Sequence, residues 1–295
     1  FPQTMSGTAD GRTMLDRPVD TLEHFEGCLI QHGPSNDRVY LMKLGPSDPE
    51  RVALSLIAKA TEQGYSKVFA KVPDSAQDAF LRHGFQVEAR IPGFYNGSKD
   101  AAFLGFYLSY ERTREENRSV LDSLLDLYLN DSASPPAALP DGFLLRLCSR
   151  DDTSRMAQIY STVFPSYPFP IHDPSYLRET METHVRYFGI EAVGTLIALS
   201  SAEMDRECGN VEMTDFATLP EWRGYRLSVH LLRAMEEAMR AERFITAYTI
   251  ARSSSPGMNL TFARCGYRYG GRMINNTNIS GQIESMNVWY KRLED

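Results

Sequence analysis

The stretch from Val211 to Met239 constrains the fold of this chain more than any other. It predicts a strand, a tight turn at Leu219-Pro220, and an amphipathic helix that opens at Arg223-Gly224. A helix that starts beside a glycine presents free backbone N–H groups and the positive end of its dipole, which together suit a phosphate. We therefore expect a strand–turn–helix unit that binds a phosphorylated ligand.

The segment 131–142 is the best candidate for a boundary between two domains. A chain of 295 residues is long enough for two, and this segment is rich in proline and small residues. It separates an N-terminal unit over 1–130 from a C-terminal unit over 143–295. From 143 onward the expected order is β-α-α-β-β-β-α-β-α-β-β, an α/β arrangement with a mixed sheet and helices on both faces.

Several local expectations follow from hydrophobic periodicity and from turn residues. Residues 1 to about 18 lack a periodic pattern and are expected to be loosely ordered. In the N-terminal unit we expect strands at 28–32, 38–44, 67–73, 86–91 and 101–110, and helices at 49–63, 75–82 and 111–129. Near the C-terminus, strands at 267–274 and 283–293 should flank a polar segment at 275–282.

The two units contain a degenerate repeat. Gly84 is followed 23 residues later by Tyr107, and Gly266 is followed 23 residues later by Trp289. Each copy reads strand, helix ending in Gly-aromatic, strand, polar turn, strand. The first copy has no glycine at the start of the helix that precedes Lys67. The N-terminal unit is therefore not expected to bind the phosphorylated ligand.

Composition excludes several classes of partner. The net charge of -7 and the absence of any Lys/Arg run argue against nucleic acid. No apolar stretch approaches membrane-spanning length, and the start has no signal-peptide pattern. The four cysteines are scattered without metal-ligand spacing. We expect a cytoplasmic protein that binds no metal and no membrane.

Long strings in the chain resemble the β-lysine N6-acetyltransferase family of the GNAT superfamily. They are SYPFPIHDP (166–174), EMTDFATLPEWRG (212–224), AYTIARSSSPGMNLTFARCGYRYGGRMINNTNI (247–279), ESMNVWYK (284–291) and IPGFYNG (91–97). The resemblance covers most of 143–293 and parts of 20–110. It implies a GNAT fold preceded by a smaller, degenerate GNAT-like α/β domain. It also implies acetyl transfer from acetyl-CoA to the terminal amine of β-lysine, giving N6-acetyl-β-lysine, a compatible solute.

The resemblance also implies where acetyl-CoA would bind. The superfamily fingerprint Gln/Arg-x-x-Gly-x-Gly/Ala is imperfect here, because Arg226 and Ser228 replace two small residues. Arg226 lacks the freedom of glycine, but its charge could pair with a phosphate. Asn259 would contact the pantetheine arm or cap a helix. The expected cofactor-binding residues are Phe216, Ala217, Thr218, Arg223, Gly224, Tyr225, Arg226, Leu227, Ser228, Asn259 and Phe262.

The chemistry requires a base, because a lysine-like amine with a pKa of about 10.4 arrives protonated. Glu212 and Asp215 are the candidates, and we favour Glu212, with Glu203 as a third option. Three residues apart on a regular strand, Glu212 and Asp215 face opposite sides unless a bulge intervenes. In the family, a backbone N–H here near Phe216 to Thr218 would stabilise the oxyanion.

The superfamily often protonates the leaving thiolate with a tyrosine, but that position here is Phe262. Either the thiolate leaves unassisted, or Tyr267 or Tyr269 serves as the acid. We expect direct attack of the amine on the thioester, without an acyl-enzyme on Cys265.

Substrate recognition must accommodate a carboxylate, a β-ammonium and a four-carbon stem. The aromatic residues Phe164, Tyr167 and Phe169 would wall the stem or simply cap the sheet. Arg252 would pair with the carboxylate, and Glu203 is also expected among the substrate-binding residues. Asn276 and Asn278 would contact the substrate or shape a turn through left-handed backbone angles.

Other readings stay open at this stage. Another small amine, such as α-lysine, could be the acceptor, or the chain could be a non-catalytic CoA-binding module. A homodimer is possible.

Overall fold

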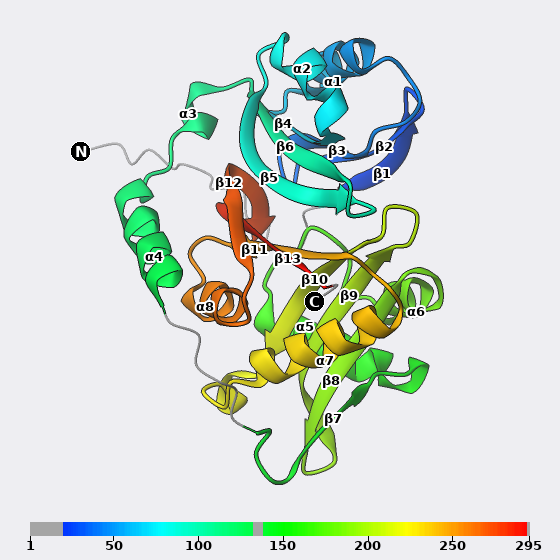
Figure 1. Cartoon of the computed structure of the whole chain (residues 1–295), viewed down its shortest axis with the longest axis vertical. Coiled ribbons are helices and arrows are strands. Elements are labelled where there is room, and N and C mark those ends of the chain that lie inside the picture. Colours follow the sequence, from blue (N-terminus) through cyan, green and yellow to red (C-terminus); the bar gives the residue numbers. More distant parts are fainter. Residues whose placement is uncertain (1–19, 132–137, 294–295) are drawn as a thin grey trace, which may run out of the picture.

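The computed structural model describes residues 20–131 and 138–293, and Figure 1 shows the path of the chain. The segment 1–18 and most of the predicted linker lie outside the described residues. Within the described part, one sheet of 13 strands runs through the molecule in the order β1-β2-β3-β4-β6-β5-β12-β13-β11-β10-β9-β8-β7.

The N-terminal half, residues 20–130, supplies six strands and four helices of the described structure. They are β1 (Thr21–Phe25), β2 (Cys28–Gly33), β3 (Arg38–Lys43), α1 (Pro49–Gln63), β4 (Lys67–Pro73), α2 (Asp74–Leu81), β5 (Gln86–Tyr95), β6 (Lys99–Tyr107), α3 (Tyr110–Thr113) and α4 (Arg118–Asn130).

The C-terminal half, residues 143–293, supplies the rest of the sheet. Its elements are β7 (Phe143–Leu147), η2 (Arg150–Asp152), α5 (Thr153–Val163), α6 (Pro174–Thr183), β8 (Val185–Ala192), β9 (Thr195–Asp205), β10 (Asn210–Thr218), η3 (Pro220–Trp222), α7 (Leu227–Ala241), β11 (Thr246–Arg252), α8 (Pro256–Arg264), β12 (Arg268–Ile279) and β13 (Gln282–Arg292).

The predicted repeat is visible in the strand order, which is mirrored about the contact between β5 and β12. Outward from that contact, β5-β6-β4-β3-β2-β1 corresponds to β12-β13-β11-β10-β9-β8. β3 pairs with β4 in parallel, as β10 does with β11, and α1 and α7 are the corresponding crossovers. The N-terminal half therefore repeats the topology of the C-terminal half without counterparts of α5, α6 and β7.

Several predicted elements differ from the structure. The single helix expected over 111–129 is interrupted at Arg114 and forms α3 and α4. The strand β1 was not predicted, because TLEHF has few apolar residues and is largely exposed. The helix expected from Arg223-Gly224 begins only at Leu227. No helix in the described ranges is long and apolar enough to cross a bilayer.

The polar segment 275–282, predicted to lie between two strands, is largely the end of β12. Between Met273 and Thr277 the register of β12 against β13 shifts, and Asn275 has a positive φ of 42°. This bulge removes three backbone carbonyls from the strand ladder. The N-terminal half pairs with them instead: Lys67 donates to Ile274 O, Arg112 to Asn275 O, and Arg38 to Asn276 O.

The two halves join where β12 crosses β5 at a single residue pair, Gly271 with Ala89. A Cβ atom at Gly271 would lie 2.2 Å from Glu88 O, and one at Gly270 would lie 2.6 Å from Arg90 O. Only glycine permits this approach, and Gly271 also has a φ of 140°. A shared apolar core beside the crossing contains residues of both halves, among them Tyr40, Phe69, Phe94, Tyr248, Met273 and Val288.

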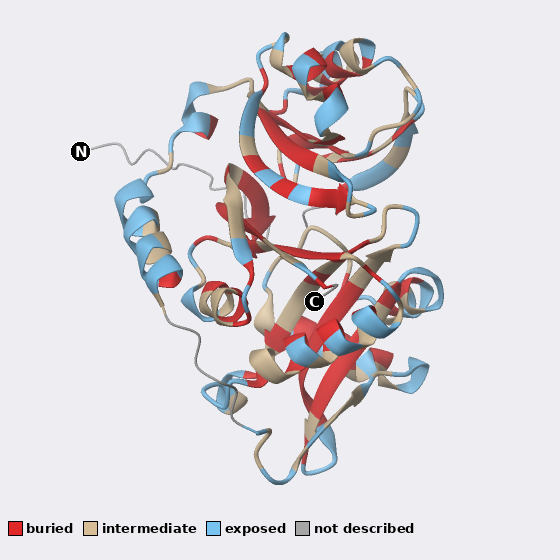
Figure 2. Ribbon diagram, in the orientation of Figure 1, coloured by how far each residue is buried: buried red, intermediate tan, exposed pale blue. Residues whose placement is uncertain are grey.

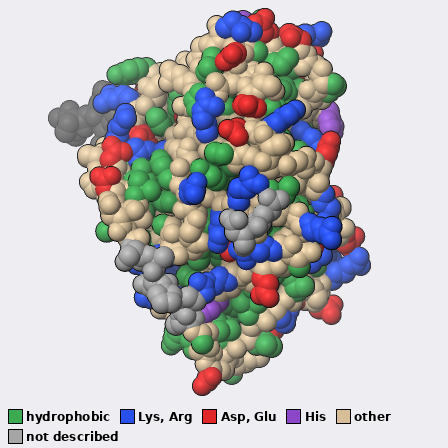
Figure 3. Space-filling model, viewed as in Figure 1, with side chains coloured by type: hydrophobic (Ala, Val, Ile, Leu, Met, Phe, Trp, Pro, Cys, Tyr) green, Lys and Arg blue, Asp and Glu red, His purple; other side chains and the backbone are tan. Residues whose placement is uncertain are grey.

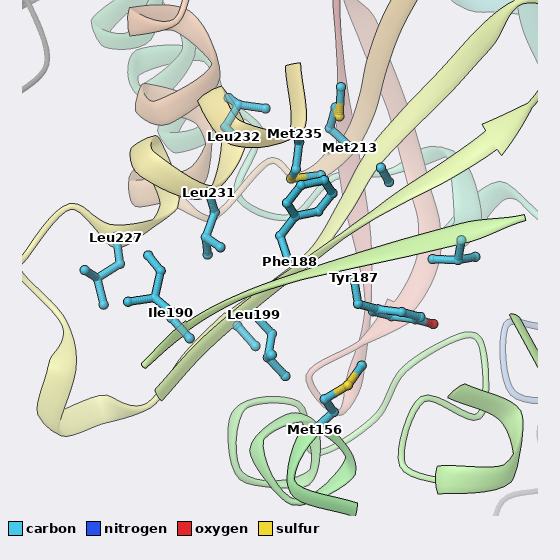
Figure 4. Packing of buried hydrophobic residues seen from close by; sticks show 14 of the residues in the cluster. Met156, Tyr187, Phe188, Ile190, Leu199, Met213, Leu227, Leu231, Leu232 and Met235 are labelled. Atoms are coloured by element: carbon cyan, nitrogen blue, oxygen red, sulfur yellow. The ribbon is translucent and has the colours of Figure 1, made fainter. Parts of the chain in front are cut away.

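The C-terminal half encloses its own core around α7. Leu231 and Met235 of this helix face Met213 of β10 and Phe188 of β8, while Met156 of α5 lies on the other side of the strands (Figure 4). Figure 2 shows the same layering, with buried strands between helices whose outer surfaces are exposed. Because Val211 and Met213 point under α7, Glu212 and Thr214 point to the opposite face.

We predict that Gly271→Ala destabilises the junction of the two halves. The added methyl group would collide with the backbone of β5, so the melting temperature should fall by several degrees, in line with a loss of about 2 kcal/mol or more. Thermal denaturation followed by circular dichroism measures it. The matched control is Gly257→Ala in α8, where an added Cβ meets nothing within 4 Å. A Gly271→Ala protein as stable as this control would contradict the prediction.

Candidate active site

A cavity of about 680 Å³ lies between β10, β11, α7 and α8. Its volume falls within the range of ordinary ligand pockets. The predicted site residues that line it are Phe164, Tyr167, Asp215, Phe216, Thr218, Arg223, Gly224, Tyr225, Arg226, Leu227, Ser228, Arg252 and Phe262. The structure thus brings together most of the expected cofactor site with Asp215, one of the two candidate carboxylates.

The cavity exists because β10 and β11 separate. They pair in parallel only from Asn210 to Glu212, although β10 continues to Thr218 and β11 to Arg252. Beyond Glu212 the facing edges of the two strands no longer bond to each other. Unpaired backbone groups on a strand edge can bind an extended ligand by main-chain hydrogen bonds.

The N-terminus of α7 opens into this cavity. No side chain caps the helix, so its first backbone N–H groups stay available. Arg226, the residue before the helix, has a left-handed φ of 57° and ψ of 30°, and with the exposed Arg223 it makes the rim positive. Basic side chains gather across the middle of this face of the molecule (Figure 3). Helix dipole and charge together favour an anion here.

The corresponding helix of the N-terminal half, α1, has a different start. The side chain of Asp48 caps it by accepting a hydrogen bond from Arg51 N at 3.1 Å, and Glu50 follows in the first turn. A carboxylate here uses a free donor and repels phosphate. This supports the expectation that the N-terminal half does not bind the phosphorylated ligand.

Glu212 and Asp215 would face opposite sides of a regular strand, but a bulge in β10 that includes Asp215 changes this. The register against β9 shifts between Thr214 and Ala217, and Asp215 has a left-handed φ of 54°. The Ser201 hydroxyl, from the residue opposite Thr214, donates to Asp215 Oδ2 at 2.6 Å. Asp215 therefore points to the same face of the sheet as Glu212 and Thr214.

Asp215 is the carboxylate that reaches the cavity. The Tyr167 hydroxyl donates to its other oxygen, Oδ1. Burial raises the pKa of Asp215, although the hydrogen bonds from Ser201 and Tyr167 oppose that effect. Burial and the neighbouring charge of Asp215 likewise raise the pKa of Tyr167. Asp215 thus combines a raised pKa with access to the ligand, as a general base requires.

Glu212 is not among the residues that line the cavity and lies near the junction of the two halves. It stands directly opposite Glu203 on β9 and beside Tyr248 on β11, whose hydroxyl donates to it. Burial and the adjacent Glu203 raise the pKa of Glu212 to about 8. The residue favoured as the base on sequence alone therefore does not line the cavity.

Three predicted residues have structural surroundings that differ from the expectation. Tyr267, a candidate acid, is only 4% exposed and packs 5.0 Å from the Phe262 ring, behind the cavity wall. Tyr269, the other candidate, packs against Trp289. Asn259 neither lines the cavity nor caps α8: it accepts from Trp289 Nε1 at 2.8 Å and donates to Arg252 O at 2.9 Å. The side-chain amide of Asn259 thus links α8 to β11 and β13 by hydrogen bonds.

The residues expected to recognise the substrate are separated by the fold. Arg252 lines the cavity, but Glu284 already pairs with its guanidinium, at 2.6 Å from Nη2 and 3.0 Å from Nε. Asn276 and Asn278 are buried against the N-terminal half, where Asn278 N donates to the Asn36 side chain at 2.7 Å. Phe169 and Ala217 pack into the core beside the cavity without lining it.

The sequence did not single out Ser201 or Lys71. Ser201 lies two residues before Glu203 on a strand, so the same-face spacing could have linked them. Lys71 is, with Lys67, one of two charged residues in the otherwise apolar strand KVFAKVP, which is the signal that was available. Within 20–131 and 138–293, no group of three or more His, Cys, Asp or Glu side chains is placed to hold a metal ion.

The chain is similar to several known proteins. Residues 154–267 match the acetyltransferase (GNAT) family. The chain is 39% identical over 266 residues to a β-lysine N6-acetyltransferase of Methanococcus maripaludis, covering 90% of this chain and 96% of the relative. It is 31% identical to a β-lysine N6-acetyltransferase of Methanosarcina mazei, covering 83% of this chain and 97% of the relative. The spermidine/spermine N-acetyltransferase SpeG of Vibrio cholerae matches 52% of this chain and 95% of its own, at 17% identity and a TM-score of 0.45.

We predict that Arg226→Gly stabilises the ligand-free protein by roughly 1 kcal/mol, because glycine adopts the left-handed conformation without steric cost. Chemical denaturation gives the free energy of unfolding. Arg223→Gly is the matched control, since Arg223 is also exposed but has an ordinary negative φ of -72°. This variant should lose stability. Equal effects of the two substitutions would show that the backbone at Arg226 stores no strain.

Proposed function

Because the chain belongs to the β-lysine N6-acetyltransferase family of the GNAT acetyltransferases, we propose that it transfers the acetyl group of acetyl-CoA to the N6 amine of β-lysine. The observation that carries the proposal is the cavity in which an uncapped helix N-terminus, a divided strand pair and the carboxylate of Asp215 meet. The product would be a zwitterion with a neutral side chain, which is the chemistry of a compatible solute.

The cavity fits the parts of acetyl-CoA. The pyrophosphate would accept hydrogen bonds from the first N–H groups of α7, with Arg223 and Arg226 adding charge. The amides of the pantetheine arm would bond to the open edge of β10, between Phe216 and Thr218. The rings of Phe216 and Phe262, edge to face at 5.6 Å, wall the inner part of the cavity.

We propose Asp215 as the general base, in place of Glu212. Its carboxylate reaches the cavity, and the raised pKa makes it a better proton acceptor than an exposed aspartate. Tyr167 and Ser201 hold both of its oxygens in place. The proton would leave N6 for Asp215, directly or through one water, before the amine attacks the thioester carbon.

The remaining steps need few further groups. Backbone N–H groups near Phe216 to Thr218, after the bulge, would stabilise the oxyanion. Phe262 leaves the thiolate without a tyrosine acid, and a thiol pKa only modestly above neutral makes unassisted departure feasible. Cys265 lines the cavity, but burial raises the pKa of its thiol and makes it a poor nucleophile. This supports direct attack rather than an acyl-enzyme.

We place the protein in the cytoplasm, since Cys28, Cys148, Cys208 and Cys265 are all free thiols. A homodimer stays a prediction, as do the exact domain boundaries at 130 and 143.

A panel of amines tests the proposed function. With acetyl-CoA in excess, kcat/KM for β-lysine should exceed that for α-lysine by about tenfold or more, because groups built for one arrangement of charges are left unpaired by another. CoA release measures the rate, and mass spectrometry with fragmentation locates the acetyl group on N6. No product with β-lysine, or equal kcat/KM for the two isomers, would overturn the assignment.

We predict that Asp215→Asn lowers kcat by a factor of about 10² to 10³. The base acts only when ionised, so the wild-type rate should fall as the pH drops through the raised pKa of Asp215. The Asn variant should lack that acidic limb, while its KM for acetyl-CoA stays the same. Rates measured across pH at saturating acetyl-CoA provide both tests.

Glu212→Gln is the matched comparison, because Glu212 lies on the same face and also has a raised pKa. We expect it to raise the KM for the amine more than it lowers kcat. If Glu212→Gln abolishes turnover and Asp215→Asn does not, Glu212 is the base.

A further inference from the structure

A charged cluster at the junction of the two halves takes no part in the chemistry described so far. Its cation is Lys71, on β4 of the N-terminal half. The Lys71 ammonium lies 5.5 Å from the centre of the Phe94 ring and 5.9 Å from that of Tyr248 on β11. The two rings are in edge contact at 5.0 Å. Lys71 therefore reaches across the junction to the strand that borders the cavity.

Among the described residues, Lys71 has no hydrogen bond or ion pair within contact distance; its neighbours are the aromatic rings and, further away, the carboxylates of Glu212 and Glu203. Burial disfavours the ammonium, but the neighbouring Tyr40 and Tyr95 and, to a smaller extent, Glu212 and Glu203 raise the pKa of Lys71 and keep it charged. Lys71 is thus a charged, partly buried ammonium without a hydrogen-bonded oxygen among the described residues. A bound anion would complete its pairing.

The carboxylates of the cluster are poorly paired as well. Glu203 and Glu212 stand directly opposite each other on neighbouring strands, and like charges so placed repel. Among the described residues, the ion-pair partner of Glu203 within 4 Å is His184, at 3.9 Å and only if protonated, while Lys71 lies further away. A bound ammonium would relieve the repulsion between the two carboxylates.

We propose that Lys71, Glu203 and Glu212 form the subsite for the zwitterionic head group of the substrate. Lys71 binds the carboxylate, and the two glutamates bind the β-ammonium. The inference rests on the proposed function and gives the N-terminal half a role in it: this half completes the amino-acid subsite of the C-terminal half.

The position of the cluster along β10 agrees with the length of the substrate. Glu212 precedes Asp215 by three residues, which is about 10 Å on a regular strand and less across a bulge. In β-lysine, six bonds of about 1.5 Å separate N6 from the carboxyl carbon, which is roughly 7 to 8 Å when extended. A head group at Glu212 therefore places N6 beside Asp215. Tyr167 packs against both the core of the C-terminal half and the junction core, so its ring borders the intervening stem.

The test of the cation is Lys71→Met with a substrate that lacks the carboxylate. 1,4-Diaminopentane is β-lysine without that group. The wild-type kcat/KM should favour β-lysine over the diamine by about tenfold to a hundredfold, typical of a hydrogen bond to a charged group. In Lys71→Met the ratio should fall to near one, through the KM for β-lysine, while the KM for acetyl-CoA and the melting temperature stay close to wild type.

Lys59→Met is the matched control, because Lys59 lies on α1 of the same half and pairs with Glu23. This variant should keep the wild-type ratio. A Lys71→Met protein that remains folded and keeps the wild-type ratio would overturn the inference.

Glu203→Gln tests the carboxylate side with 6-aminohexanoate, which is β-lysine without the β-amine. The wild-type preference for β-lysine over 6-aminohexanoate should fall severalfold in the variant. An unchanged preference would remove Glu203 from the subsite. If the wild-type protein does not acetylate β-lysine at all, the proposed function itself fails; if it does and the variants keep the wild-type ratios, only the head-group subsite fails.

Discussion

Three buried cations pairing with three consecutive backbone carbonyls hold the two halves of this protein together. Lys67, Arg112 and Arg38 donate to the carbonyls of residues 274, 275 and 276, which the bulge in β12 withdraws from the strand ladder. Burial lowers the pKa of Lys67 to about 8 and that of Arg38 to about 10, which reflects the cost of placing these charges inside the protein. Leaving the three buried carbonyls without hydrogen-bond donors would be costly too. The cations of the N-terminal half and the carbonyls of the C-terminal half therefore satisfy each other's hydrogen-bonding groups.

This junction determines the surroundings of the cavity. It fixes β12 and β13 beside β11, so that the edge of β11 facing β10 has a defined position. It also brings β4 against Tyr248, which places Lys71 near the carboxylates of β10 and β9. Local strain then adjusts the site, since Asp215 and Arg226 both occupy left-handed backbone conformations next to the cavity. The bulge at Asp215 turns the carboxylate, and the turn at Arg226 exposes the start of α7.

The sequence predicted the parts of the fold that depend on local pattern. The helix 49–63 and the strand 67–73 match the structure residue for residue, and the repeat of Gly84 to Tyr107 in Gly266 to Trp289 appears as a mirrored strand order. The site was harder to predict from the sequence, because its geometry depends on irregularities in the strands that hydrophobic periodicity does not encode. Which of Glu212 and Asp215 reaches the cavity depends on the bulge, and the surroundings of Asn276 and Asn278 depend on the other half of the protein.

The mirrored sheet also bears on how such a chain can evolve. Its two halves have the relation of subunits in a two-fold dimer, but a single polypeptide carries both, so each can change without altering the other. At the start of α1, Asp48 stands where a phosphate-binding loop would need open backbone donors. A copy that need not bind the ligand could keep its folded scaffold and diverge at the surface that it presents to the other half. The chain is thus an asymmetric pseudo-dimer in which one copy has become part of the environment of the other.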